Sequence, residues 1–244
     1  MWMICKKEWN QFFSSATSYI ILCIFLLING LLLFVFPDTS LLNFGYANLN
    51  GFFNIIPWLL LFLVPAITMK TIAEEIRSGT FEVLRCLPLS PAKIILGKYL
   101  GALFILFISL LPTVMYAFSM QALSITGGID TGATIGSYIS LFMLAGVYAA
   151  IGIFASSITK NTITAFALGA FLCFILFIGF DAMSQLPVFS GGADYYISLF
   201  GIKSHTTNMA RGIIDSKDLI YFTALVTFFL YLTHLQINQQ HSQS

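Results

Sequence analysis

The sequence predicts an all-α integral membrane fold with six transmembrane helices, and the evidence is its composition and the spacing of its charges. Of its 244 residues, 58% are hydrophobic and only 9% are charged, whereas soluble domains are about 25% charged. Six stretches carry no charged residue: 9–37, 39–69, 99–129, 131–159, 161–180 and 219–244. Each can hold the ~20 apolar residues that cross a bilayer. This composition excludes a soluble enzyme, a secreted disulfide scaffold and a nucleic-acid-binding protein.

Residues 1–17 are predicted to form an amphipathic helix in the headgroup plane, ahead of the first span. Trp2 and Trp9 share one helical face, and Lys6 and Lys7 supply positive charge. Lysines combined with tryptophans suit a helix that lies on a membrane. The specific interpretation is an elbow helix that steers the first span, and the alternative is a generic membrane-anchoring flank.

The charge distribution predicts the topology of one six-helix domain over residues 18–235. The expected spans are 18–36, 52–71, 97–120, 134–156, 162–183 and 217–235. With the N-terminus inside, eight of the 11 Lys and Arg residues fall on the cytoplasmic side. The positive-inside rule therefore favours cytoplasmic termini, and residues 236–244 form a polar cytoplasmic tail.

Residues 70–98 form a charged cytoplasmic loop between the second and third spans. One interpretation is a continuous amphipathic helix that places Glu74, Glu75 and Glu82 on one face. The alternative is a break at Gly79, because glycine is the favoured residue just past a helix end. Such a loop suits docking of a soluble partner, or it is a solvated connection whose charges only set the topology.

The outer segment, residues 185–215, leads into the sixth span. Asp215 is predicted to cap that span, with Asp218 in its first turn. Arg211 and Asp215 have the i, i+4 spacing of an ion pair on a helix. These charges make either a well-formed helix start or an external gate. The sequence also leaves open whether 185–215 contains re-entrant helices.

Four polar residues inside the spans are candidates for facing a transport pathway: Asn29, Asn54, Tyr116 and Tyr148. No Asp, Glu, Lys or Arg is expected deep in any span, which argues against an ion-coupled carrier. A stripe of small residues follows the fourth span at Ala145, Ala149, Gly152 and Ser156. Such stripes allow close helix packing, here either within the subunit or across a dimer.

Several segments resemble the ABC-2 type transporter permeases over nearly the whole chain. The loop carries Glu-Glu-x-x-x-Gly-Thr-x-Glu-x-Leu (74–84) and Leu-Pro-Leu-Ser-Pro (87–91), followed by Gly-Lys-Tyr-Leu-Gly (97–101). The outer segment carries Ala-Arg-Gly-x-Ile-Asp-x-x-Asp-Leu-x-Tyr-Phe (210–222). Segments 25–31, 57–69, 134–138 and 151–157 are similar to the gliding-motility branch of that family (GldF-like, NosY-like). Arg85-Cys86 departs from the small or polar uncharged pair expected there.

The resemblance implies a cytoplasmic coupling helix between helices 2 and 3 that contacts a separate ATP-binding subunit. The coupling residues it implies are Glu74, Glu75, Gly79, Thr80 and Glu82. The chain lacks a GxxxxGK[ST] phosphate loop, so we expect no catalysis and no bound cofactor or metal in it, and a partner ABC ATPase uses ATP and Mg.

The further implications concern partners and location. The implied partners are a second permease copy or a related permease subunit, and an accessory protein of gliding motility. The implied location is the bacterial inner membrane with both termini cytoplasmic, and the implied role is export associated with gliding motility. The alternative function is a non-transporting integral-membrane assembly or scaffold factor of a motility or secretion complex.

Overall fold

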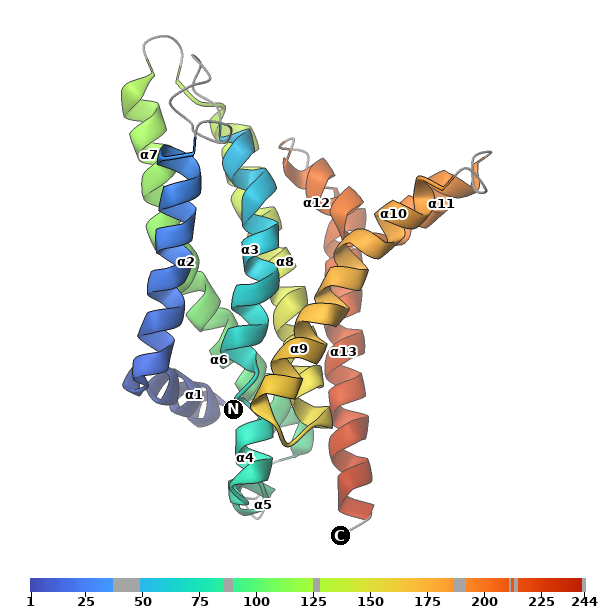
Figure 1. Ribbon diagram of the computed structural model, residues 1–244. Helices are drawn as coiled ribbons and strands as arrows, with labels where there is room; N and C mark the ends of the chain where they lie inside the picture. The colour runs from blue at the N-terminus through green and yellow to red at the C-terminus, as the bar shows by residue number, and fades with distance from the viewer. Residues whose placement is uncertain are drawn as a thin grey trace.

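The computed structural model describes residues 1–36, 49–85, 90–124, 128–186, 192–210, 212 and 215–242. Over these residues the chain is built from helices, arranged as a membrane-type bundle (Figure 1). The elements are α1 (Trp2–Ser14), α2 (Ala16–Phe34), α3 (Asn50–Thr68), α4 (Ala73–Arg77), α5 (Thr80–Arg85), α6 (Pro91–Leu110), η1 (Leu111–Thr113), α7 (Val114–Leu123), α8 (Thr131–Ile158), α9 (Thr162–Phe174), the π-helix η2 (Ile175–Gly179), α10 (Phe180–Ser184), α11 (Ala193–Phe200), α12 (Ile202–Ala210) and α13 (Ser216–Ser242).

The six predicted membrane spans are confirmed within the described residues. The helices long and apolar enough to cross a bilayer are Ala16–Phe34, Asn50–Arg77, Pro91–Leu123, Thr131–Ile158, Thr162–Ser184 and Ser216–Gln239. The second span runs past its predicted end because α4 continues α3 after a short turn at 69–72. The chain is therefore a multi-pass helical membrane protein.

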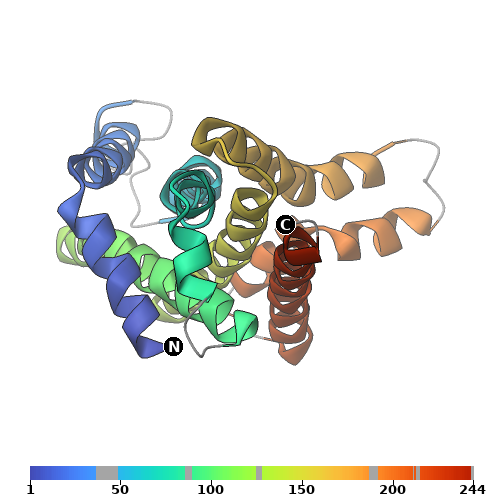
Figure 2. The ribbon, with the colours of Figure 1, turned by 90° about the horizontal axis from the view of Figure 1, so that it is seen from below.

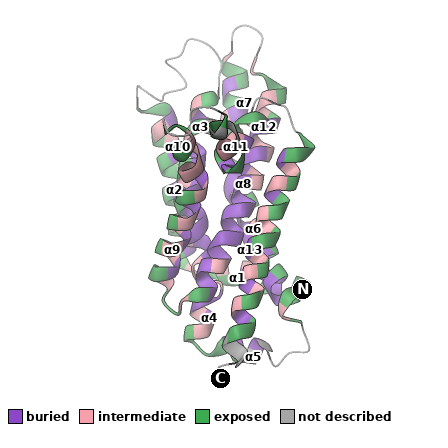
Figure 3. Cartoon of the chain, turned by 90° about the vertical axis from the view of Figure 1, so that its right-hand side faces the viewer, coloured by how far each residue is buried: buried purple, intermediate pink, exposed green. Residues whose placement is uncertain are grey.

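Helix α8 lies at the centre of the bundle, where buried residues follow its length (Figure 3). The small-residue stripe of this helix is fully buried. A Cβ atom at Gly152 would overlap the hydroxyl of Thr68 on α3. On α9, a Cβ atom at Gly169 would come 3.4 Å from Pro65 Cβ. Of the two roles left open for the stripe, close packing within the subunit is thus the one observed.

Ser156, at the end of the stripe, holds the turn between α3 and α4. Its hydroxyl accepts hydrogen bonds from the backbone N–H groups of Ile72 at 3.1 Å and Ala73 at 2.9 Å. The same hydroxyl donates to the Met69 carbonyl at 3.1 Å. A helix break leaves backbone groups without partners, and one side chain from α8 satisfies three of them. The direction of α4 is therefore fixed relative to the central helix.

Helix α1 lies across the end of the bundle, beneath α2 and beside α6 (Figures 1 and 2). Two glycines on α6 allow it to come close. A Cβ atom at Gly97 would lie 2.9 Å from Ile4 Cβ, and one at Gly101 would lie 2.8 Å from Glu8 Cβ. The N-terminal segment thus forms a helix, and this helix packs directly on the start of the third span.

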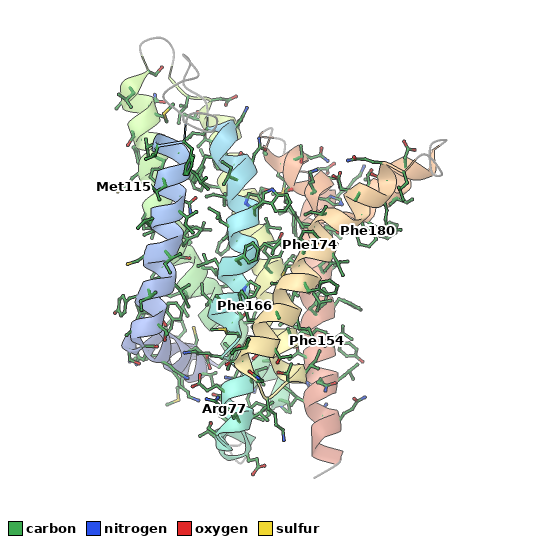
Figure 4. All side chains as sticks on the ribbon, viewed as in Figure 1. Arg77, Met115, Phe154, Phe166, Phe174 and Phe180 are labelled. Atoms are coloured by element: carbon green, nitrogen blue, oxygen red, sulfur yellow. The ribbon has the colours of Figure 1, made fainter. Side chains whose placement is uncertain are left out.

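The two ends of the bundle differ in construction. The N-terminus, the α4–α5 segment and the end of α13 lie at one end, and α11 and α12 lie at the other (Figure 1). In Figure 4, Arg77 lies at the end of the bundle that carries α4. The side chain of Met115 on α7 points away from the bundle. In the outer segment, the described residues 192–210 form the short helices α11 and α12. The second of these packs on α8, since Ser140 Oγ donates to the Thr206 carbonyl at 3.3 Å.

We predict that Gly152→Ala destabilises the protein by about 1–3 kcal/mol, because a methyl group must be forced into a packed helix contact. The free energy of unfolding in detergent measures this effect. Thr68→Ala in the same chain should restore part of the loss by removing the hydroxyl that the methyl group meets. The control is Gly132→Ala on the same helix, where the new Cβ comes no closer than 3.4 Å to Asp130 Oδ1. Equal stability of the two alanine variants would contradict the close packing of α3 on α8.

Candidate functional site on the loop between the second and third spans

The loop breaks at Gly79 into two short helices. Helix α4 ends at Arg77, and the N–H of Ser78 bonds to the Glu74 carbonyl at 2.9 Å. Gly79 follows with φ +72°, a left-handed conformation that glycine adopts without steric cost. Helix α5 then starts at Thr80. The second of the two interpretations, a break at Gly79, is therefore the observed one, and a continuous amphipathic helix is not formed.

The tip of this loop presents polar groups while its apolar side chains hold it to the bundle. Gly79, Thr80 and Glu82 are exposed. Phe81 and Leu84 are buried, and Leu84 packs with Ile4 of α1 and Ile94 of α6. Hydrophobic burial of this kind fixes the orientation of α5 without covering its polar face.

Glu75 belongs to an ion cluster, which we define as Lys7, Glu8, Glu75 and Lys98 and call the buried ion cluster because all of its members except the exposed Lys7 are buried. Lys98 Nζ lies 2.7 Å from Glu8 Oε1 and 2.8 Å from Glu75 Oε2. Lys7 Nζ lies 2.6 Å from Glu75 Oε1. The helical pattern placed Glu75 on the same face as Glu74 and Glu82, but its side chain is only 5% exposed. Sequence periodicity failed here because it describes one helix and not the charged neighbours that α1 and α6 bring to it.

Lys98 is the member of the ion cluster with the least access to water. Its side chain is 1% exposed. In addition to its two carboxylate partners, its Nζ donates to the Thr71 carbonyl at 2.6 Å, in the turn between α3 and α4. A buried charge persists only when it is paired and hydrogen-bonded. The cluster therefore ties together α1, α4, α6 and the end of α3.

Sequence analysis named Lys7 as a charge of the N-terminal helix and included Lys98 in the 97–101 segment, but it did not predict that they pair with Glu75 and Glu8. One signal of this pairing was present. Gly97 and Gly101 flank Lys98 at a spacing of one helical turn. The structure explains this spacing. The two glycines let α1 approach α6, and Glu8 of α1 then meets Lys98, which lies between the glycines.

The outer candidates form a helix start rather than an open charged patch. Asp215 Oδ1 accepts from the Lys217 N–H at 3.3 Å just before α13, as predicted for a cap. Asp218 lies in the first turn, also as predicted, but its carboxylate is buried 2.6 Å from His205 Nδ1. Arg211, and with it the proposed Arg211–Asp215 pair, lies outside the described residues.

His205 of α12 is a residue that sequence reasoning missed. Its Nε2 lies 2.8 Å from the Leu199 carbonyl, and its ring stacks on Tyr221 with centroids 4.0 Å apart. Because a carbonyl only accepts, Nε2 is the donor in that bond. The side chain thus joins the end of α11 to the start of α13, through partners that lie in other helices.

The four pathway candidates have different surroundings. Asn54 is exposed and lines a cavity of about 450 Å³ between α3, α8 and α12. Asn29 is buried and donates to the Phe25 carbonyl at 2.8 Å. Tyr116 packs edge-on against Phe52, and Tyr148 is buried in the core.

Replacing Lys98 with alanine is expected to destabilise the protein by about 3–5 kcal/mol, because Glu8 loses its buried partner and Glu75 retains only Lys7. Thermal unfolding in detergent measures the loss. The triple variant Glu8→Gln/Glu75→Gln/Lys98→Met should recover most of it, because it leaves no buried charge unpaired.

The matched control for this prediction is Lys93→Ala, which removes an exposed lysine from the same helix. We expect it to unfold like the unaltered protein. If Lys98→Ala unfolded at the same temperature as this control, the ion cluster would not hold the end of the bundle together.

The comparison with known families agrees with this architecture. The sequence model of the family described as ABC-2 family transporter protein matches residues 35–189. The match covers more than half of the 244 residues and includes the loop with α4 and α5. A search of curated proteins found no match to the chain. The six candidate membrane helices among the described residues are consistent with this family match. The chain therefore belongs to the ABC-2 family of transporter membrane proteins.

Proposed function

We propose that this chain is the permease subunit of an ATP-driven exporter and receives a separate ABC ATPase at the tip of the α4–α5 segment. Permeases of the ABC-2 family generally work with such an ATPase. The observation that carries the proposal is the construction of the loop. Its exposed tip offers Gly79, Thr80 and Glu82, and its base is fastened by the buried ion cluster.

The proposed mechanism is mechanical coupling through that base. A soluble partner that pushes on α5 cannot move it alone, because Phe81 and Leu84 are buried against the bundle. The displacement passes to α4, then through Glu75 to Lys98 on α6 and to Lys7 on α1. Spans two and three therefore move as a unit. In this proposal Glu75 positions the loop and the exposed Glu82 faces the partner, whereas Glu74 lines a cavity between α1, α2 and α6.

The finer assignments rest on the sequence resemblance. We propose that two permease copies, or this chain and a related subunit, form one pathway and use the ATP and Mg bound by their ATPases. The α4–α5 end lies in the cytoplasm and the protein resides in the bacterial inner membrane. Similarity to the gliding-motility branch supports a role in motility or its secretion machinery, together with an accessory protein.

A pull-down from gently solubilised native membranes tests the docking surface. The unaltered chain should bring down a separate ATPase, and Glu82→Lys should reduce the amount about tenfold, because one reversed charge at an interface costs ~1.4 kcal/mol or more. Asp194→Lys is the matched control, because it reverses an exposed acid at the opposite end of the bundle. It should leave the recovered ATPase activity unchanged.

Two outcomes count against the proposal. If no ATPase accompanies the unaltered chain, the transporter loses its energy source, and the non-transporting assembly factor becomes the better account. If Glu82→Lys and Asp194→Lys recover equal amounts of ATPase, the partner docks elsewhere on the chain.

Labelling with a membrane-impermeant maleimide tests the orientation. We expect Asp194→Cys to react in intact cells, or in spheroplasts where an outer membrane is present, and Glu82→Cys to react only after permeabilisation of the inner membrane. The unaltered chain, with its four cysteines, gives the background. The reverse pattern would place the α4–α5 end outside and remove it from any cytoplasmic ATPase.

A further inference from the structure

A cavity of about 320 Å³ lies at the end of the bundle where α1 turns into α2. Its walls come from α1, α2, the end of α3, the start of α4, and α6. Figure 1 shows α1 passing beneath α2 at this level. A volume of this size falls in the lower range of small-ligand sites, ~300–1,000 Å³.

One part of the cavity wall is polar and carries one free charge of each sign. Lys70 lines it, and its Nζ donates a long hydrogen bond of 3.4 Å to Thr17 Oγ1. Glu74 lines it four residues later, and its carboxylate has no hydrogen bond or ion pair among the described residues. Glu8 also borders the cavity, but Lys98 neutralises it. The charge available to a ligand is therefore one ammonium group and one carboxylate.

Ser18 adds a second observation that points to a ligand. Its side chain lines the cavity and the residue is only 6% exposed. Within the described part of the chain its hydroxyl has no hydrogen-bond partner, and its oxygen is not fully buried but remains open to the cavity. A polar group that enters the cavity would supply the missing partner.

The remaining wall is apolar and belongs to membrane-spanning helices. Ile21 of α2, Ile67 of α3 and Ile105 of α6 line it. All three helices have the length and composition of membrane spans. The cavity thus joins a polar mouth at the level of α1 to an apolar wall that extends toward the hydrocarbon region. This is the polarity profile of one lipid molecule.

We propose that this cavity binds a zwitterionic phospholipid with a primary ammonium headgroup, of the phosphatidylethanolamine type. Lys70 and the hydroxyls of Thr17 and Ser18 hold the phosphate, and Glu74 accepts hydrogen bonds from the ammonium group. The acyl chains lie along the isoleucines. An anionic headgroup leaves Glu74 unpaired and repelled, and a choline headgroup has no N–H to donate to it.

The site goes beyond the proposed transport function and does not depend on it. A lipid here would brace α1 against α2 and α3, next to the ion cluster that Glu8 shares with the cavity wall. Helix α1 would then be held by its ion pairs and by the bound lipid.

Native mass spectrometry of the full chain, purified in mild detergent and titrated with single lipids, tests the proposal. The unaltered chain should bind phosphatidylethanolamine about tenfold more tightly than phosphatidylglycerol or phosphatidylcholine. Lys70→Ala should lose about tenfold in phosphatidylethanolamine affinity, and Lys70→Arg should retain it. Glu74→Gln should remove the preference over phosphatidylglycerol, because it removes the carboxylate that selects the ammonium group.

Lys93→Ala is the matched control, because this exposed lysine lies at the same end of the bundle outside the cavity. It should bind lipid like the unaltered chain. Ser18→Ala gives an independent readout if Lys70→Ala fails to fold, and it should also weaken binding. The proposal is overturned if phosphatidylglycerol binds best to the unaltered chain, or if Lys70→Ala and Lys93→Ala bind alike. Equal affinity for soluble glycerophosphoethanolamine would also overturn it, since the site would then take a free phosphoester.

Discussion

Lys98 places a positive charge where water barely reaches, and this charge constrains the whole α4–α5 end of the bundle. Its side chain is 1% exposed, so its carboxylate partners on α1 and α4 must stay within contact distance. Removing one partner of such a group costs far more than the pair itself contributes to stability. Helices α1, α4 and α6 are therefore held in one arrangement by the need to keep this lysine paired.

Two further features help to hold the helices in that arrangement. Ser156 of α8 satisfies the backbone at the turn from α3 to α4, so α4 leaves the bundle in a fixed direction toward Lys98. Gly97 and Gly101 leave the space that brings Glu8 to the same lysine. The exposed tip at Gly79, Thr80 and Glu82 is thus carried on a rigid base. In the proposed coupling to an ATPase, a soft loop with the same tip would bend under the partner's push and transmit little of it to the spans.

Much of the fold was predictable because the bilayer imposes simple rules. Charge-free runs of sufficient length gave the six spans, and Gly79 marked the break in the loop. Asp215 was recognisable as a cap, because capping is local chemistry. The candidate site was only partly predictable. Glu82 proved exposed, as its helical face indicated, but Glu75 proved buried because its partners come from helices distant in the sequence.

The sequence by itself determined the class of protein, the number of membrane helices and the position of the charged loop, because hydropathy and helix-breaking residues act locally. Only the tertiary structure decided which charges are paired. It brought Glu8 to Lys98 across 90 positions and His205 to Asp218 across the turn into α13. It also assigned the small-residue stripe to packing of α8 on α3 and α9. The physical reason is that pairing and burial depend on which helices meet, and no residue pattern within one helix contains that information.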